Sequence, residues 1–125
     1  MKIVDYNIFN GQKNMDIDSE ILEESIRLNR KEAVLRFYGW SPACVSLGRN
    51  QKDDFIDYNL LKKYGVDCVR RLTGGRALFH DKELTYSYVI PVSELENGEN
   101  ITESYKQISG ILIDIFEKLG IKLTI

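Results

Sequence analysis

The stretch Arg-Arg-Leu-Thr-Gly-Gly-Arg-Ala-Leu-Phe-His-Asp occupies residues 70–81 and joins two runs of strand-like sequence. Three arginines and the only histidine of the sequence flank its Gly-Gly pair. Two adjacent glycines let the backbone approach a ligand closely and point N–H groups at an anion. Arginine adds planar, multidentate recognition of phosphate or carboxylate. The stretch therefore predicts a strand–turn–strand unit whose turn recognises an anion.

An apolar run follows this turn directly. Ala77, Leu78 and Phe79 would supply a hydrophobic lining beside the arginines. A ligand that fits such a site is anionic at one end and apolar at the other, as a fatty-acyl group joined to a phosphate or a thioester is. The plain alternative is a β-hairpin whose arginines are solvated, and the motif alone leaves both interpretations open.

Outward from the turn, apolar periodicity and turn residues predict a series of helices and strands. Before it we expect helices at residues 14–28 and 55–64 and strands at residues 31–40, 44–47 and 66–69. After it we expect strands at residues 77–80, 84–90 and 121–125, with a polar loop at residues 93–100. An amphipathic helix should lie between that loop and the last strand, capped by Thr102 and followed by Gly120. This mixture predicts an α/β (α+β) fold.

Composition excludes several classes of protein. The 125 residues are 43% hydrophobic and 29% charged, as expected for one globular domain. A net charge of −2 provides no overall field for nucleic acid. No run approaches the roughly 20 apolar residues of a membrane span, and the opening residues are too polar for a signal sequence. Cys44 and Cys68 lack metal-ligand spacing, so we expect no metal site and a cytoplasmic protein with reduced thiols.

Three segments together resemble a known family. They are residues 11–18, residues 35–51, and the turn with its continuation Glu83-Leu84-Thr85-Tyr86-Ser87, and their order and spacing match over nearly the whole sequence. The family is the lipoate/octanoate branch of the biotin/lipoate A/B protein ligase superfamily. The resemblance implies a mixed β-sheet flanked by helices, similar to the catalytic core of class II aminoacyl-tRNA synthetases and biotin ligases.

The resemblance also implies an activity. Members place an octanoyl or lipoyl group on a lysine of lipoyl carrier domains, such as glycine cleavage H protein or 2-oxoacid dehydrogenase E2. Octanoyltransferases move the acyl group through a cysteine thioester, with acyl carrier protein as a possible donor, whereas lipoate-protein ligases adenylate the free acid with ATP and Mg²⁺. Ligases usually have a third glycine where this sequence has Arg76, and a Gly-Asn pair where it has Lys82 and Glu83. These differences favour the transferase, without a tightly bound cofactor, and leave the ligase as the alternative.

The resemblance assigns substrate binding to the turn and its apolar run, namely Arg71, Thr73, Gly74, Gly75, Arg76, Ala77, Leu78, Phe79 and His80. The family's nucleophilic cysteine and acyl-contacting lysine lie further downstream. We therefore expect residues 1–125 to be the N-terminal portion of one catalytic domain, truncated after Ile125 and inactive by itself. A further alternative is a non-catalytic half that binds an acyl ligand or a complementary subunit.

The remaining reactive side chains are expected to have structural or binding roles. Cys44 and Cys68 lie in apolar strands and are interpreted as buried, inert thiols. His80 is expected to shape the acyl pocket rather than act as a base, although the adjacent Asp81 would be able to fix its tautomer. A hydrolytic triad of His80, Asp81 and Ser87 is a weak hypothesis, because Ser87 lacks the glycines of a nucleophile elbow.

Overall fold

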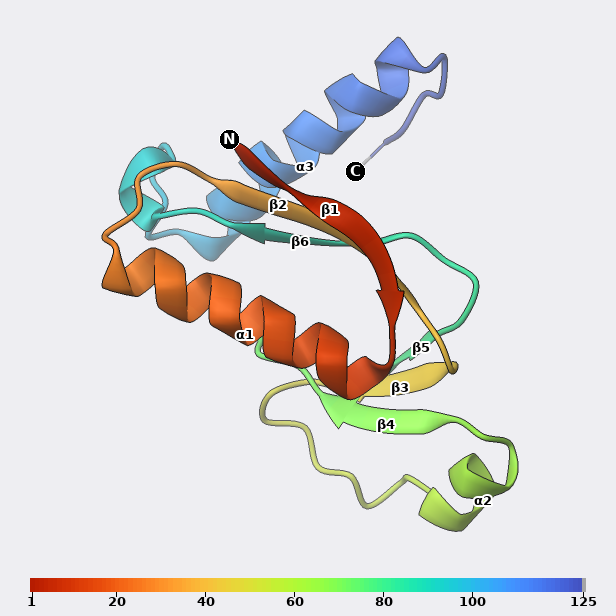
Figure 1. Ribbon diagram of the computed structural model, residues 1–125. Helices are drawn as coiled ribbons and strands as arrows, with labels where there is room; N and C mark the ends of the chain where they lie inside the picture. The colour runs from red at the N-terminus through yellow and green to blue at the C-terminus, as the bar shows by residue number, and fades with distance from the viewer. Residues whose placement is uncertain (125) are drawn as a thin grey trace. The chain divides into compact units, whose positions relative to one another are not determined.

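The structure is a computed structural model that describes residues 1–124. The chain forms two compact units, Met1–Val89 and Ile90–Ile125, which are described separately. The first unit contains two three-stranded sheets and two helices, and the second contains a short 3₁₀-helix and a long α-helix. The predicted α/β (α+β) class, with mixed sheet and helices, is confirmed. The strands are divided between two small sheets (Figure 1).

The first sheet has the strand order β1-β2-β6. Its central strand β2 (Val34–Trp40) runs parallel to β1 (Lys2–Phe9) and antiparallel to β6 (Thr85–Val89). Strand β2 is buried along nearly its whole length, whereas β1 is largely exposed. The sequence did not predict β1, because Asp5 and Asn7 interrupt its apolar pattern and only pairing with β2 identifies it as a strand.

Helix α1 (Gly11–Arg27) crosses one face of this sheet and reaches the second sheet (Figure 1). It begins three residues earlier than predicted, because the Asn10 side chain caps it by accepting from the Lys13 N–H at 2.8 Å. Asn14 is buried and donates to the carbonyl of Gly39 at 2.9 Å, which attaches the helix to β2. A Cβ on Gly11 would collide with Cys44, so the absence of a side chain brings the helix start against β3.

The second sheet has the order β4-β3-β5. Strand β3 (Cys44–Leu47) runs parallel to β4 (Asp67–Arg70) and antiparallel to β5 (Leu78–His80). Helix α2 (Tyr58–Lys63) precedes β4. It is shorter than the predicted helix at residues 55–64, because Asp57 caps it and Gly65 adopts a positive φ of 65° after it. These three strands position the Gly-Gly turn, which connects β4 to β5.

The second unit contains the 3₁₀-helix η1 (Val92–Glu94) and α3 (Ile101–Lys118). The predicted cap was wrong: Asn100 caps α3, because its side-chain oxygen accepts from the N–H groups of Thr102 and Glu103 at 3.0 and 3.3 Å. The predicted strand at residues 121–125 does not form over residues 121–124, where no strand partner pairs with them, and residue 125 lies outside the described residues. The helices of residues 1–124 include none with the length and apolarity to span a membrane.

Candidate functional site

Arg70, the last residue of β4, and Arg71, which follows it, both donate to backbone carbonyls. Arg70 donates through Nη1 to the carbonyls of Gly48 and Gln51, each at 2.7 Å. Arg71 donates through Nη2 to the carbonyls of Gly74 and Arg76, at 2.8 and 2.7 Å. The Arg70 side chain therefore secures the loop after β3, and the Arg71 side chain secures the Gly-Gly turn.

The turn rests on the loop that follows β3. The Arg49 N–H donates to the Thr73 carbonyl at 2.8 Å. A Cβ on Gly48 would penetrate the carbonyl oxygen of Gly75, so only glycine allows this approach of two backbones. Gly75 has a φ of 96°, which also favours glycine, whereas a Cβ on Gly74 would meet open space. Sequence reasoning did not assign Gly48 to the site, although it lies in one of the three segments that carry the family resemblance.

We call the two hydrogen bonds from Arg71 Nη2 to the carbonyls of Gly74 and Arg76 the Arg71 clamp. This clamp also orients N–H groups of the turn. In a planar trans peptide the N–H points away from the preceding carbonyl. Because Arg71 holds the carbonyls of Gly74 and Arg76, the N–H groups of Gly75 and Ala77 point away from the guanidinium. Within residues 1–124 neither N–H donates a hydrogen bond to the protein. Unpaired backbone donors such as these are suited to the carbonyl or phosphate oxygens of an acyl ligand.

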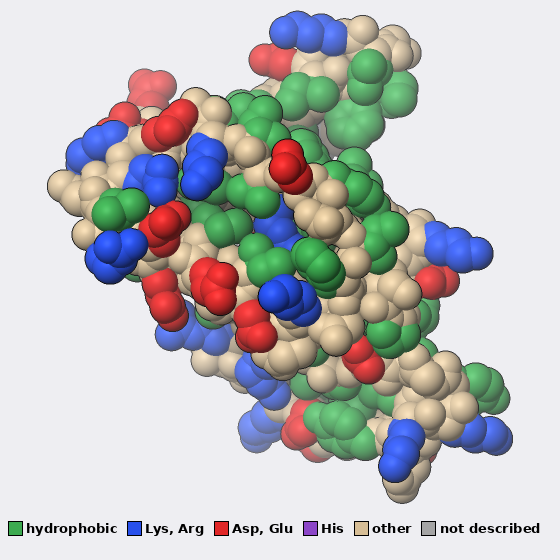
Figure 2. Space-filling view, in the orientation of Figure 1, with side chains coloured by type: hydrophobic (Ala, Val, Ile, Leu, Met, Phe, Trp, Pro, Cys, Tyr) green, Lys and Arg blue, Asp and Glu red, His purple; other side chains and the backbone are tan. Residues whose placement is uncertain are grey.

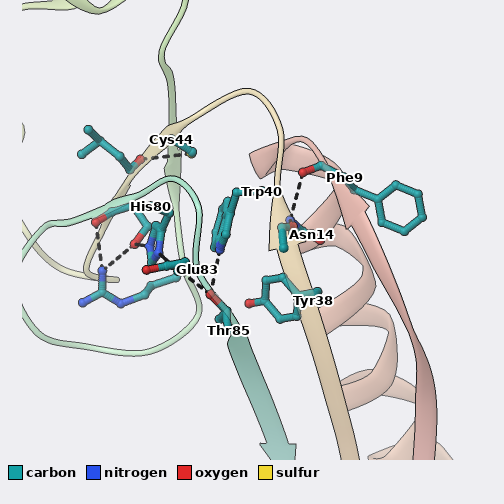
Figure 3. A network of polar contacts seen from close by, with 12 residues as sticks. Phe9, Asn14, Tyr38, Trp40, Cys44, His80, Glu83 and Thr85 are labelled. Carbon is teal, nitrogen blue, oxygen red and sulfur yellow. Dashed lines mark hydrogen bonds and ion pairs between the residues drawn. The ribbon is translucent and has the colours of Figure 1, made fainter.

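His80 is buried beside this turn and both of its ring nitrogens have partners. Nε2 lies 2.7 Å from Ser46 Oγ, and Nδ1 contacts Glu83 Oε1. The sequence indicated Asp81 as a residue able to fix the His80 tautomer, and this hypothesis was wrong. The chain turns after His80 and brings Glu83 to the ring instead. The Trp40 indole stacks on the imidazole with centroids 4.1 Å apart (Figure 3).

Ser46 is the point at which the histidine and the arginine meet. Its hydroxyl accepts from Arg71 Nη1 at 3.1 Å and lies next to His80 Nε2. Arg71 and His80 are therefore on one face of the β4-β3-β5 sheet. The register places Leu78 opposite Ser46 on that face, half exposed, but places Phe79 opposite Val45 on the other face. The exposed Thr73 and Arg76 and the half-buried Ala77 lie on the turn itself.

The geometry around this histidine does not form an accessible hydrolytic triad. The hypothetical triad with Ser87 does not form, because Ser87 pairs with Arg36 in the first sheet while Ser46 and Glu83 occupy the His80 ring. Ser46, His80 and Glu83 have the order of a serine–histidine–acid triad, but Ser46 is only 1% exposed. A substrate carbonyl has no access to its hydroxyl.

The two cysteines are free, and neither has the properties of a nucleophile. Burial raises the pKa of the Cys44 thiol to about 12, and Asp67 and Cys68 add to the shift. Burial also raises the pKa of Cys68. Because the thiolate is the reactive form, both thiols are expected to be inert. Within residues 1–124 no three His, Cys, Asp or Glu side chains are grouped to hold a metal ion.

Two hollows lie elsewhere on the first unit. One runs along α1 and is lined by Ile17, Glu20, Ile21, Glu23, Glu24 and Arg27. Figure 2 shows acidic and basic side chains gathered over this helix. The other lies between α2 and β4 and includes Tyr58 and Cys68. Neither hollow includes a residue of the Gly-Gly turn.

The sequence matches the profile of the lipoyl protein ligase A/B catalytic domain over residues 10–125. An octanoyltransferase LipM from Carboxydothermus hydrogenoformans is 41% identical over 122 residues, which cover 97% of this chain and 45% of that protein. The LipM of Staphylococcus aureus is 43% identical over 110 residues, which cover 86% of this chain and 39% of that protein. The chain thus spans less than half the length of these relatives.

Solved structures agree with this match at the level of the fold. A lipoate-protein ligase A bound with ATP superimposes with a TM-score of 0.75 at 24% identity, covering 97% of this chain and 47% of that one. A Thermoplasma acidophilum protein with bound lipoic acid superimposes with a TM-score of 0.73 at 24% identity, with coverage of 97% and 48%. The chain belongs to the lipoyl protein ligase A/B catalytic domain family, as the resemblance in its sequence indicated.

Proposed function

We propose that this chain takes part in the transfer of an octanoyl or lipoyl group onto a lysine of a lipoyl carrier domain. The observation that carries the proposal is the Gly-Gly turn held by Arg71. In this turn the N–H groups of Gly75 and Ala77 are unpaired and directed away from the Arg71 guanidinium. Such donors stabilise the charge that develops on a carbonyl oxygen during acyl transfer. The identity of about 40% to octanoyltransferases supports the same assignment.

Within this family we propose the octanoyltransferase reaction, with a carrier-bound thioester as donor and no tightly bound cofactor. The curated relatives at about 40% identity are octanoyltransferases, whereas the ATP-bound ligase is 24% identical over the part that superimposes. Arg76 also stands where ligases usually have a glycine. Lipoate-protein ligase, with ATP and Mg²⁺, is the second candidate, because structures of that kind share the fold.

The acceptors we propose are glycine cleavage H protein and the E2 lipoyl domain, and the donor is acyl carrier protein. A bipartite lipoate protein ligase from Thermoplasma acidophilum, studied with its E2 lipoyl domain, superimposes with a TM-score of 0.52 over 72% of this chain. Two free thiols fit the cytoplasm as the compartment. We also propose that the chain is the N-terminal portion of a catalytic domain, which supplies the turn while residues from elsewhere activate the acyl carbon.

An acyl-transfer assay with two donors tests this function. Two proteins are compared: the 125-residue chain, and the chain fused to the second half of the Carboxydothermus LipM. Each receives glycine cleavage H protein with either octanoyl-acyl carrier protein alone or octanoate with ATP and Mg²⁺, and the acceptor mass is measured. We expect the fusion to octanoylate the acceptor from the carrier-bound donor without ATP, and the chain alone to leave it unmodified.

The other outcomes have defined meanings. Modification that requires ATP would replace the transferase with the ligase. Modification by the chain alone that is lost in Cys44→Ala would show that the nucleophile lies within the chain. An acceptor that stays unmodified with both donors, while the intact LipM modifies it, would contradict the function. An H protein whose acceptor lysine is replaced by arginine serves as the negative control.

A further inference from the structure

The neutral His80 ring has one tautomer that satisfies both of its contacts. Glu83 is a carboxylate and accepts hydrogen bonds without donating them, so the Nδ1 that contacts it carries a proton in the neutral ring. Nε2 is then an acceptor, and the Ser46 hydroxyl donates to it across 2.7 Å. Glu83 therefore selects the tautomer of His80.

The tautomer in turn determines what Ser46 offers to Arg71. When the Ser46 hydroxyl proton points to His80, the lone pairs of Oγ are free for Arg71 Nη1, which lies 3.1 Å away. In the opposite tautomer Nε2–H and Arg71 Nη1–H would both donate to Oγ, and the hydroxyl proton of this buried side chain would have no acceptor among the contacts that Oγ makes in residues 1–124. The carboxylate of Glu83 thus favours the hydroxyl orientation that the Arg71 clamp needs.

Arg71 carries the arrangement to the turn. Its Nη1 also donates to the Ser46 carbonyl at 2.9 Å, which fixes the guanidinium against β3. Its Nη2 then holds the carbonyls of Gly74 and Arg76 and so directs the two unpaired N–H groups. The terminal nitrogens of this guanidinium are occupied by protein groups, so its orientation is set before any ligand arrives.

Glu83 itself is held from the first sheet. Thr85, at the start of β6, donates its hydroxyl to Glu83 Oε1 at 2.9 Å, and the Trp40 indole N–H donates to Thr85 Oγ1 at 2.8 Å (Figure 3). Because Trp40 also stacks on His80, one side chain of β2 orients both members of the histidine–glutamate pair. The contacts form a continuous series from β2 to the Gly-Gly turn.

We propose that Glu83 is a positioning residue for the acyl site: through His80, Ser46 and Arg71 it directs the N–H groups of Gly75 and Ala77 toward the acyl oxygen. The geometry of the series stands by itself, and its meaning for acyl transfer rests on the proposed function of the turn. Glu83 touches no substrate in this scheme. It acts by fixing which atom donates and which accepts in each hydrogen bond from its own carboxylate through His80 and Ser46 to Arg71.

The single histidine makes the first test direct. In the 125-residue chain labelled with ¹⁵N, the two ring nitrogens of His80 give one pair of long-range ¹H–¹⁵N signals. We expect the proton on Nδ1 in the wild type and a shift of the proton toward Nε2 in Glu83→Gln. The amide signals of Gly75 and Ala77 should move in the same variant, while those of α1 stay in place. A wild-type proton on Nε2, or stationary Gly75 and Ala77 amides in Glu83→Gln, would overturn the proposal.

Matched variants separate positioning from general damage. Asp81→Asn removes a neighbouring carboxylate that does not contact His80, and should leave the tautomer and both amides unchanged. Thr85→Val keeps the shape of Thr85 but removes its hydroxyl, so it should produce the Glu83→Gln shifts in smaller form even if Glu83→Gln does not fold. Glu83→Asp retains a carboxylate and should restore part of the Nδ1 proton. A full shift in Asp81→Asn, or no shift in Thr85→Val, would count against the series.

The catalytic consequence is measured in the LipM fusion. Aligned N–H donors stabilise mainly the transition state, and Glu83→Gln should misalign them. The variant should therefore lower kcat about tenfold and leave KM nearly unchanged. A fusion with no activity in its wild-type form would contradict the proposed function, while the tautomer and amide signals would still decide the role of Glu83. Wild-type kcat in Glu83→Gln together with shifted amides would show that the series does not serve acyl transfer.

Discussion

Two arginines of the first unit, Arg36 and Arg71, bind polar groups in opposite ways. Arg36 is 2% exposed, and its guanidinium donates to Asp18 Oδ1 at 2.8 Å and to Asn14 Oδ1 at 2.6 Å. It also lies 3.9 Å from the Tyr38 ring centroid. Arg71 is half-buried and holds carbonyls and a hydroxyl, with no carboxylate within 4.0 Å in the part of the chain that the structure describes.

This difference separates an arginine whose charge is paired with a carboxylate from one whose charge is not. The charge of Arg36 is neutralised inside the protein, where an unpaired charge would be costly, so the cluster attaches α1 to β2. The charge of Arg71 has no neutralising partner in the described residues and remains beside the open turn. Its N–H groups shape the turn while its positive charge stays available to an anionic ligand. Anion recognition by Arg71 therefore stays a prediction of the sequence, and the structure adds that Nη1 and Nη2 already donate to protein groups.

The largest expected effect comes from breaking the Arg36 cluster. Arg36→Met leaves Asp18 charged and Asn14 without its partner, so the free energy of unfolding should fall by about 3–5 kcal/mol. Urea unfolding followed by Trp40 fluorescence measures this loss. Asp18→Asn is the milder companion, because its oxygen can still accept from Arg36 and its NH2 group can donate to the Tyr38 hydroxyl. Equal stability of Arg36→Met and the wild type would show that the cluster does not hold α1.

Alkaline pH should weaken the same buried region. Burial and Asp18 raise the pKa of Tyr38, and burial raises that of Cys44 from 9.0 to about 12. The unfolded thiol therefore loses its proton first, and the unfolded state binds fewer protons above pH 9, so stability falls as the pH rises. By pH 10.5 we expect a loss on the order of 2–3 kcal/mol, most of it from Cys44. Thermal unfolding from pH 8 to 10.5 measures the slope, and a slope that Cys44→Ala and Tyr38→Phe leave unchanged would exclude both groups as its source.

Replacing the turn arginine should affect the whole fold less. Arg71→Met removes several hydrogen bonds to carbonyls that water can partly replace, so stability should fall by about 1–2 kcal/mol. Its main effect should be local: the Arg49 amide, which donates to the Thr73 carbonyl of the turn, should exchange with solvent faster while the amides of α1 do not. Hydrogen exchange detects this pattern. If the α1 amides lose as much protection as the Arg49 amide, the two arginines have the same kind of role and the comparison fails.

The smallest effect on stability is expected at Gly74, the first glycine of the Gly-Gly turn. Gly74→Ala places a methyl group in open space, so stability should change by no more than about 0.5 kcal/mol. If the acyl ligand approaches this backbone, the methyl group should nevertheless reduce transfer by the LipM fusion. Gly75→Ala is the strained counterpart, because its φ of 96° should cost about 1–3 kcal/mol. Full transfer by Gly74→Ala would place the ligand elsewhere.

Local sequence signals identified most helices and strands and the Gly-Gly turn, because periodicity and turn residues act over a few positions. They failed where a pairing partner decides the structure. Strand β1 has a broken apolar pattern and forms against β2, and residues 121–124 have an apolar pattern and form no strand. The cap of α3 was misplaced by two residues because Asn100 and Thr102 are both suitable caps.

The sequence by itself determined the family, the α/β class and the chemical groups of the turn, because these depend on residue types in a fixed order. Only the tertiary structure decided how those groups are used. It brought Ser46 to a histidine 34 positions away, selected Glu83 over the adjacent Asp81, and placed Gly48 beneath Gly75. The physical reason is that such contacts depend on strand register and on the packing of one sheet against another. Neither leaves a periodic signal in the segments that it joins.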